Sequence, residues 1–276
     1  MPMGQPSPQL LKSLLEISQQ VRRDVLTMIY QAGSGHSGGC LSQVELLVAL
    51  YFHKMRVDPK NPNSPDRDRF VLSKGHACST LYSCLARKGF FPLEEMSKFR
   101  KINALLQGHA DIRVPGVEMS GGSLGQGLSF GNGLAFAAKL DKKSYTTYVL
   151  MGDGEQEEGQ IWEAAMTAAH YKLDNVVGII DRNKIQNDGF VADTKNIEPL
   201  AGKWESFGWA VKEIDGHNFH EIINALDWAD ARAGKPKLII AHTVKGKGVS
   251  FMENNPEYHG KAPNEEELKL ALKEIG

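Results

Sequence analysis

The sequence is poor in the features that mark secreted and metal-stapled proteins. Cysteine is scarce: only Cys40, Cys78 and Cys84 are present, an odd number at no metal-ligand spacing. We therefore expect free thiols in a reducing compartment, which favours a cytoplasmic location. The N-terminus lacks a basic region followed by an apolar core, so no signal peptide is expected.

Long apolar runs and an excess of either charge are also lacking. No run approaches the length that crosses a bilayer, so we expect no membrane protein. A net charge of −1 gives no electrostatic attraction to nucleic acid or to an anionic membrane. The 276 residues show no internal repeat, low-complexity tract or clear linker, which predicts a single domain over residues 1–276.

What the chain does contain is an alternation of short apolar runs and amphipathic stretches. Helical spacing predicts helices over 10–31, 42–52, 77–88, 124–140, 157–171, 218–232 and from Glu265 onward. Apolar runs predict strands over 70–72, 145–151, 176–181, 209–214 and 238–243. The pairs Ser42/Glu45 and Asn264/Glu267 have the spacing of helix caps. Strands that alternate with helices predict an α/β fold of three layers, a parallel sheet with helices on both faces.

The most informative feature is Gly152-Asp153-Gly154, with Asn183 following 30 positions after Asp153. The segment between them predicts strand, loop, helix and strand. A right-handed crossover would place Asp153 and Asn183 side by side at the carboxyl edge of the sheet. Their oxygens, with the carbonyl of Ile185, suit Mg²⁺ that also holds a phosphate group. The alternative is an ordinary turn and an unrelated loop asparagine.

Four histidines lie next to glycine in separate loops: His36, His76, His109 and His259. A single histidine is more often structural, but four in such loops favour a role in proton transfer near neutral pH. His217 also follows a glycine, and we expect it to cap the next helix. The other histidines lie inside predicted elements, where packing or exposure is expected: His53, His170, His220 and His242.

Three further segments have both a functional and a structural interpretation. The glycines of residues 120–140 allow either a close approach to a ligand or tight helix packing. Residues 243–248, TVKGKG, place Lys245 near a bound diphosphate or form a mobile basic loop; they are not a Walker A sequence. Glu155, Glu157 and Glu158 suit the first turn of a helix.

These motifs together resemble one known family. Gly-Asp-Gly with Asn183 is similar to the thiamine diphosphate signature, and GSGHSGG, LSKGHAC, QGHAD, SGGSLGQG, TVKGKG and YHG follow in the order found in transketolases. The resemblance covers essentially the whole chain, but only the N-terminal, diphosphate-binding part of a full-length transketolase. The chain thus resembles the N-terminal subunit of a split transketolase. Ser123 departs from the usual family pattern, which has proline there.

The resemblance implies roles for particular residues. Asp153, Asn183 and the Ile185 carbonyl would bind Mg²⁺, which Ca²⁺ or Mn²⁺ can replace. The remaining cofactor contacts implied are Gly154 with the diphosphate, Gly122 and Leu124 with the aminopyrimidine, Lys245 lining the site, and His76 and His259 near the diphosphate and the reacting carbons. His36 and His109 would face substrate hydroxyls, and Glu158 would join a carboxylate network at the subunit boundary. The catalytic set implied is His36, His76, His109, His259 and Glu158.

The implied activity is transfer of a two-carbon ketol unit from a ketose phosphate to an aldose phosphate, as in the pentose phosphate pathway of carbohydrate metabolism. The family's pyrimidine-binding half would come from a separate C-terminal subunit in an α2β2 heterotetramer, and the single chain would be nearly inactive. Open alternatives are a subunit of a 1-deoxyxylulose-5-phosphate synthase or 2-oxo acid dehydrogenase, and a non-catalytic cofactor-binding subunit. A Mg²⁺-nucleotide binder is the least favoured, because no nucleotide motif is complete.

Overall fold

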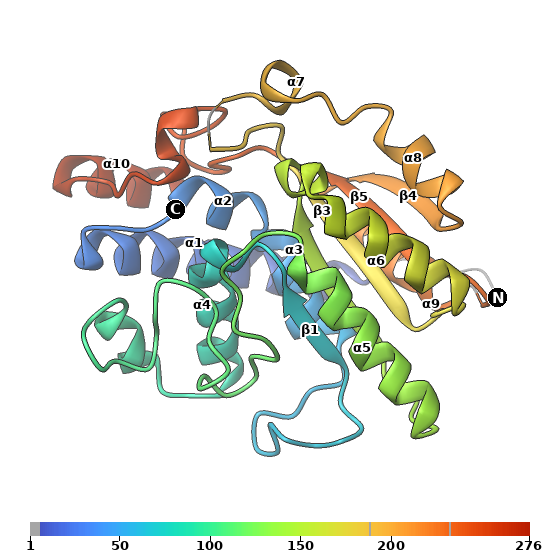
Figure 1. Ribbon diagram of the computed structural model, residues 1–276. Coiled ribbons are helices and arrows are strands. Elements are labelled where there is room, and N and C mark those ends of the chain that lie inside the picture. The colour runs from blue at the N-terminus through green and yellow to red at the C-terminus, as the bar shows by residue number, and fades with distance from the viewer. Residues whose placement is uncertain (1–5, 188, 232) are drawn as a thin grey trace.

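The computed structural model describes residues 6–187, 189–231 and 233–276 (Figure 1). Its centre is a five-stranded sheet in the order β1-β2-β3-β5-β4, and every neighbouring pair is parallel. All five carboxyl ends therefore lie at one edge. The strands are β1 (Arg69–Leu72), β2 (Thr147–Gly152), β3 (Val176–Arg182), β4 (Ala210–Asp215) and β5 (Lys237–His242).

Helices cover both faces of this sheet, because successive strand residues point to opposite sides. Leu150 packs into the core on one face and Val149 into the core on the other. The first face carries α3 (Val44–Ala49), α4 (Cys78–Lys88) and α9 (Phe219–Asp230), with α1 (Pro8–Ala32) and α10 (Glu265–Ile275) packed beyond them. The second carries α5 (Gln126–Leu140), α6 (Gly159–His170) and α8 (Leu200–Ser206). The predicted α/β fold with helices on both faces is confirmed.

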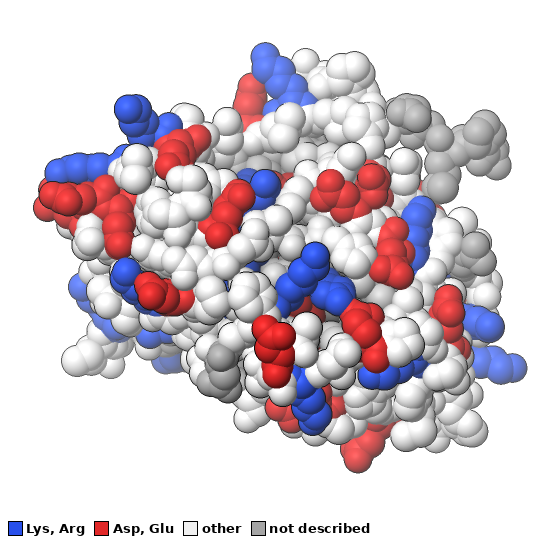
Figure 2. Space-filling model, turned by 90° about the horizontal axis from the view of Figure 1, so that it is seen from above, with Lys and Arg blue, Asp and Glu red and all other residues white. Residues whose placement is uncertain are grey.

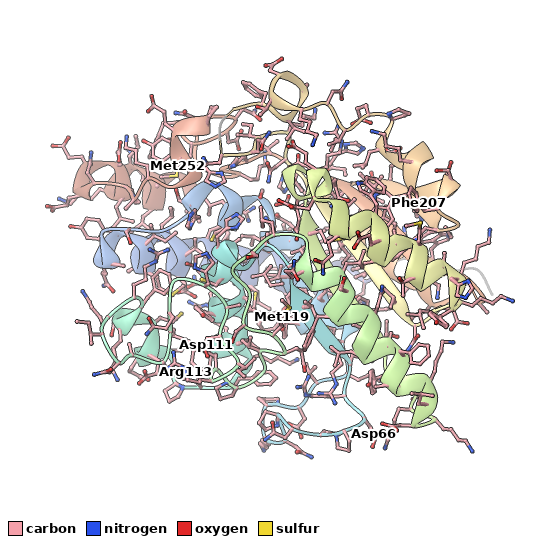
Figure 3. The ribbon with its side chains drawn as sticks, viewed as in Figure 1. Asp66, Asp111, Arg113, Met119, Phe207 and Met252 are labelled. Atoms are coloured by element: carbon pink, nitrogen blue, oxygen red, sulfur yellow. The ribbon has the colours of Figure 1, made fainter. Side chains whose placement is uncertain are left out.

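Most predicted elements are present within a few residues of their expected bounds. The cap at α10 is confirmed: the Asn264 side chain accepts from the Glu267 backbone and the Glu267 side chain from that of Asn264. Residues 107–122 are irregular, as expected. Figure 3 labels an ion pair on this segment, Asp111 with Arg113, whose charged groups lie 2.8 Å apart. The three cysteines are free and buried, as expected.

The expected cap at Ser42 and Glu45 is wrong. Helix α2 (Ser37–Ser42) begins inside the expected loop, α3 follows it, and Leu50–Lys54 forms a π-helical turn. Ser42 donates instead to Asp181 Oδ2 at 2.6 Å, and Glu45 accepts from Arg22 Nη2 at 2.6 Å. Both side chains are buried, so partners distant in the sequence outweigh the local cap.

Other local differences have similar causes. His217 does not cap α9, because Asn218 accepts from the first backbone amides while the His217 ring lies 2.9 Å from Glu45. Helix α6 begins at Gly159 after a 3₁₀ turn, Gly154–Glu157. The short helices α7 (Val191–Thr194) and α8 were not predicted. Within the described ranges, no helix combines the length and apolarity needed to span a bilayer.

Candidate functional site

A cavity of about 350 Å³ lies at the carboxyl edge of the sheet. The loops that follow β1, β2, β3 and β5 all contribute to its wall, as expected for a parallel sheet. It brings together every residue that the sequence singled out for cofactor, metal or substrate: His36, His76, His109, Gly122, Leu124, Asp153, Gly154, Glu158, Asn183, Ile185, Lys245 and His259. Figure 2 looks onto the end of the molecule near α7, where acidic and basic side chains are interspersed.

Asp153 and Asn183 reach the cavity from adjacent strands. Gly152 of β2 pairs with Asp181 of β3, so the residues that follow these positions emerge together. Asp153 is 2% exposed, and its carboxylate accepts from the backbone amides of Gly154, at 2.8 Å, and Lys184. Asn183 Oδ1 accepts from the Ile185 amide at 3.2 Å. The two side chains thus line one cavity rather than two.

The oxygen atoms at this point fit a hard divalent cation. Burial, with the nearby negative charge of Asp181, raises the pKa of Asp153 to about 6. A cation would stabilise the carboxylate form against both effects. Within the described residues, no group of three or more His, Cys, Asp and Glu side chains is placed to hold a metal. A cation here would therefore depend on one carboxylate, the Asn183 amide oxygen and the Ile185 carbonyl, a donor set of oxygen alone.

The four glycine-flanked histidines form a cluster in the same cavity. The ring centroids lie 5.0 Å apart for His36 and His76, 5.5 Å for His76 and His259, and 6.3 Å for His36 and His109. Burial, with Arg100 and His109 as further causes, lowers the pKa of His36 to about 4. Burial and the nearby Lys74 lower the pKa of His76 well below its usual value. Both rings are consequently neutral at physiological pH and can donate or accept hydrogen bonds.

Lys245 connects the proposed cation ligands with the histidine cluster. Its side chain is 2% exposed, and Nζ lies 2.8 Å from the Ile185 carbonyl oxygen and 2.7 Å from His259 Nδ1. Burial and the charge of Lys74 lower the pKa of Lys245 to about 8. The Ile185 carbonyl has a second lone pair, so it can accept from Lys245 and still face the cavity.

The structure adds a buried ion pair that the sequence did not single out. Lys74 Nζ pairs with Asp181 Oδ2 and also donates to the Gly39 carbonyl at 3.0 Å. Asp181 accepts further bonds from Ser42, from Thr243 and, at 3.1 Å, from Asn183 Nδ2. Burial alone would raise the pKa of Asp181, but Lys74 and these donors hold it below its usual value. The bond from Nδ2 fixes which end of the Asn183 amide faces Asp181.

The acidic residues after Asp153 do not share one role. Glu155 is 2% exposed and accepts from the Gly125 amide at 2.8 Å, from the Gly152 amide at 2.9 Å, and from the Ser73 hydroxyl. It joins three loops around the cavity instead of decorating a first helical turn. Glu158 precedes α6, is exposed, and makes no capping bond with its side chain. A polar residue ending an apolar strand, as Asp181 does, is the signal that could have identified the buried network.

Comparison with known proteins supports the resemblance. The family model described as "Transketolase, thiamine diphosphate binding domain" matches residues 15–276. An apulose-4-phosphate transketolase subunit of Phocaeicola vulgatus is 46% identical over 258 residues, 94% of this chain and 92% of that protein. A 6-deoxy-6-sulfo-D-fructose transketolase subunit of a Clostridium species is 46% identical over 256 residues, 92% and 93% of the two chains.

Full-length transketolases match over their first part only. The transketolase of Pongo abelii is 38% identical over 98% of this chain, which spans 43% of that protein. The crystal structure of the Campylobacter jejuni transketolase superposes with a TM-score of 0.90 at 36% identity, covering 96% of this chain and 43% of that one. The chain therefore belongs to the transketolase family and corresponds to its thiamine diphosphate-binding domain, in the size range of the relatives that are named as transketolase subunits.

Proposed function

We propose that this chain is the cofactor-binding subunit of a transketolase that requires thiamine diphosphate and Mg²⁺ and transfers a two-carbon ketol unit from a ketose phosphate to an aldose phosphate. One observation carries the proposal: the oxygen donors Asp153, Asn183 and Ile185 share a cavity with the four-histidine cluster. A site for phosphate-bound metal beside groups that hold or move protons is what ketol transfer between sugars requires. We further propose that residues 1–276 form one domain.

The cavity residues fit the cofactor. Asp153, Asn183 and the Ile185 carbonyl would hold the cation, and Gly154 would contact the diphosphate. Gly122, proposed with Leu124 to meet the aminopyrimidine, is exposed on the cavity wall, and a Cβ added there would meet no atom within 4 Å. A ligand can therefore approach its backbone closely.

Bound thiamine diphosphate supplies a carbanion that adds to the ketose carbonyl and accepts electrons when the carbon–carbon bond breaks. The protein's own task is to position groups and manage protons. His36 and His109, proposed to face substrate hydroxyls, are neutral near pH 7 because burial lowers the pKa of each. Each ring can then accept a proton or a hydrogen bond from a hydroxyl. His76 and His259 are stacked, and the bond between His259 and Lys245 fixes one end of the stack.

We propose that a separate C-terminal subunit completes the site, in an α2β2 assembly. Relatives of this length that are named as transketolase subunits, together with the 43% coverage of full-length transketolases, support a missing second half. In the family, that half supplies the pyrimidine-binding groups. Catalytic activity of the purified chain alone would contradict this part of the proposal.

An exposed apolar strip on α5 and α6 supports the assembly. Its members are Phe130, Phe136 and Leu140 on α5 and Met166 and Tyr171 on α6, between 38% and 69% exposed. They flank a groove that also includes Gln160, two residues from Glu158 at the cavity. Large apolar surface of this kind usually marks an interface. We propose that the C-terminal subunit covers the strip, because a partner seated there reaches the cavity directly.

Assays of the reconstituted complex test the function. Ketol transfer from xylulose 5-phosphate supports the proposal, whereas turnover of pyruvate alone would indicate a 1-deoxyxylulose-5-phosphate synthase or a 2-oxo acid dehydrogenase. Donors resembling those in the names of the relatives, with 4-phospho or 6-sulfo groups, belong in the same screen. Cofactor binding without turnover of any donor would favour a non-catalytic subunit. A cytoplasmic location, proposed from the three free thiols, is tested by fractionation.

A further inference from the structure

The loop that carries Lys245 is held from behind by a buried network that the proposed chemistry does not use. This segment, residues 243–248, follows β5 and is called the Lys245 loop below. The network consists of Arg22 on α1, Glu45 on α3 and His217 before α9. Arg22 and Glu45 are 7% and 6% exposed, and the His217 side chain is 14% exposed. Charged groups buried to this degree require specific partners.

Glu45 holds two arms, one with each carboxylate oxygen. Arg22 Nη2 donates to Oε1 at 2.6 Å, and His217 Nδ1 lies 2.9 Å from Oε2. The other side of each arm reaches the Lys245 loop. Arg22 Nε donates to the Lys247 carbonyl at 3.1 Å, and the Val244 amide donates to His217 Nε2 at 2.9 Å. The two contacts therefore fall on either side of Lys245.

The partners also determine the proton position on His217. A backbone amide can only donate, so Nε2 must accept and carries no proton. The proton of the neutral ring is then on Nδ1, where it is donated to Glu45. A side chain at this position needs an acceptor in the place of Nε2, but it does not need a charge.

The rest of the loop leaves Lys245 little freedom once these contacts are made. Gly246 has φ +81, and a Cβ there would lie 2.2 Å from the carbonyl oxygen of Met252, which Figure 3 labels. The Gly246 amide donates to the Gly38 carbonyl at 3.0 Å. The backbone is therefore closely packed on both sides, and a shift of the loop would move Nζ away from Ile185 and His259.

We infer that Arg22, Glu45 and His217 are positioning residues that fix Lys245 against the proposed cation ligand Ile185 and against His259. They do not touch the cavity themselves: within the described chain, the cavity wall includes Lys245 but none of the three. The inference rests on the proposed function only for the consequence that Lys245 placement matters for thiamine diphosphate.

Hydrogen–deuterium exchange of the complex with its partner subunit tests the positioning without cofactor. In His217→Ala, the Val244 amide loses its acceptor, and we expect exchange in residues 243–248 to accelerate about tenfold. In His217→Gln, a side-chain oxygen can replace Nε2, and most of the protection should return. The matched control is His242→Ala, since His242 lies beside the loop but its exposed ring contacts Glu213. Unchanged exchange in His217→Ala would overturn the inference.

A double-mutant cycle tests whether the effect passes through Lys245. Calorimetry with thiamine diphosphate and Mg²⁺ should show about tenfold weaker binding for His217→Ala, but less than a twofold change when His217→Ala is added to Lys245→Met. Equal losses in both backgrounds would show that His217 acts by another route. If the wild-type complex binds no cofactor, the proposed function fails, while the exchange experiment still decides the positioning.

Discussion

Lys74 and Asp181 form an ion pair in which the two side chains are 3% and 0% exposed. The pair joins the loop after β1 to the end of β3, and Asp181 in turn holds the Asn183 amide. A buried pair of this kind contributes less to net stability than its geometry suggests, but it is costly to break. Its main effect at this site is to orient a proposed cation ligand.

Replacing Asp181 by Asn should strongly destabilise the protein, because Lys74 would keep a buried charge without its counter-ion. We expect the free energy of unfolding, measured in urea, to fall by about 3–5 kcal/mol. The control Asp66→Asn breaks the exposed pair with Lys143 and should cost less than about 1 kcal/mol. Equal losses in the two variants would contradict a critical buried pair.

The double variant Lys74→Met/Asp181→Leu separates stability from orientation. It removes both charges, so most of the lost stability should return. The Asn183 amide, however, would have lost its acceptor at Asp181, and thiamine diphosphate should still bind more weakly than to wild type. Wild-type affinity in this double variant would show that Asp181 does not orient Asn183.

Acid should destabilise the protein through His36. Its pKa is about 4 in the folded state and near 6.5 when unfolded, so between these values the unfolded chain binds more protons. Stability is unaffected above pH 6.5 and falls as the pH drops from 6.5 to 4. Because the ring is partly exposed, we expect a loss of order 1 kcal/mol. Urea unfolding of His36→Gln should show a shallower decline over this interval, and the exposed His242→Gln should match wild type.

A charge on the apolar strip should weaken assembly with the C-terminal subunit. Met166→Glu on α6 places a carboxylate where the partner is proposed to sit, and its burial would be unfavourable. Leu270→Glu on α10 is the matched control, since Met166 and Leu270 are 53% and 48% exposed on helices at opposite sides of the molecule (Figure 1). Analytical ultracentrifugation should show dissociation for Met166→Glu alone. Equal assembly of the two variants would place the interface elsewhere.

The sequence predicted the fold well, because periodic apolar residues decide which segments can bury a face. It failed over residues 37–54, where Ser42 and Glu45 have partners that only the folded chain brings near. The predicted site residues converge because motifs at strand ends must meet at one sheet edge. The Lys74–Asp181 pair was missed for a different reason. Its members are 107 positions apart, and neither belongs to a local pattern that indicates the other.

The central claim is that Asp153 and Asn183 hold a divalent cation that anchors thiamine diphosphate. The most direct measurement is calorimetric titration of thiamine diphosphate into the complex with its partner, in Mg²⁺ and in EDTA, for wild type, Asp153→Ala and the exposed control Asp141→Ala. We predict binding for wild type and Asp141→Ala that requires Mg²⁺, and none for a folded Asp153→Ala. Metal-independent binding, or unchanged affinity in Asp153→Ala, would contradict the account.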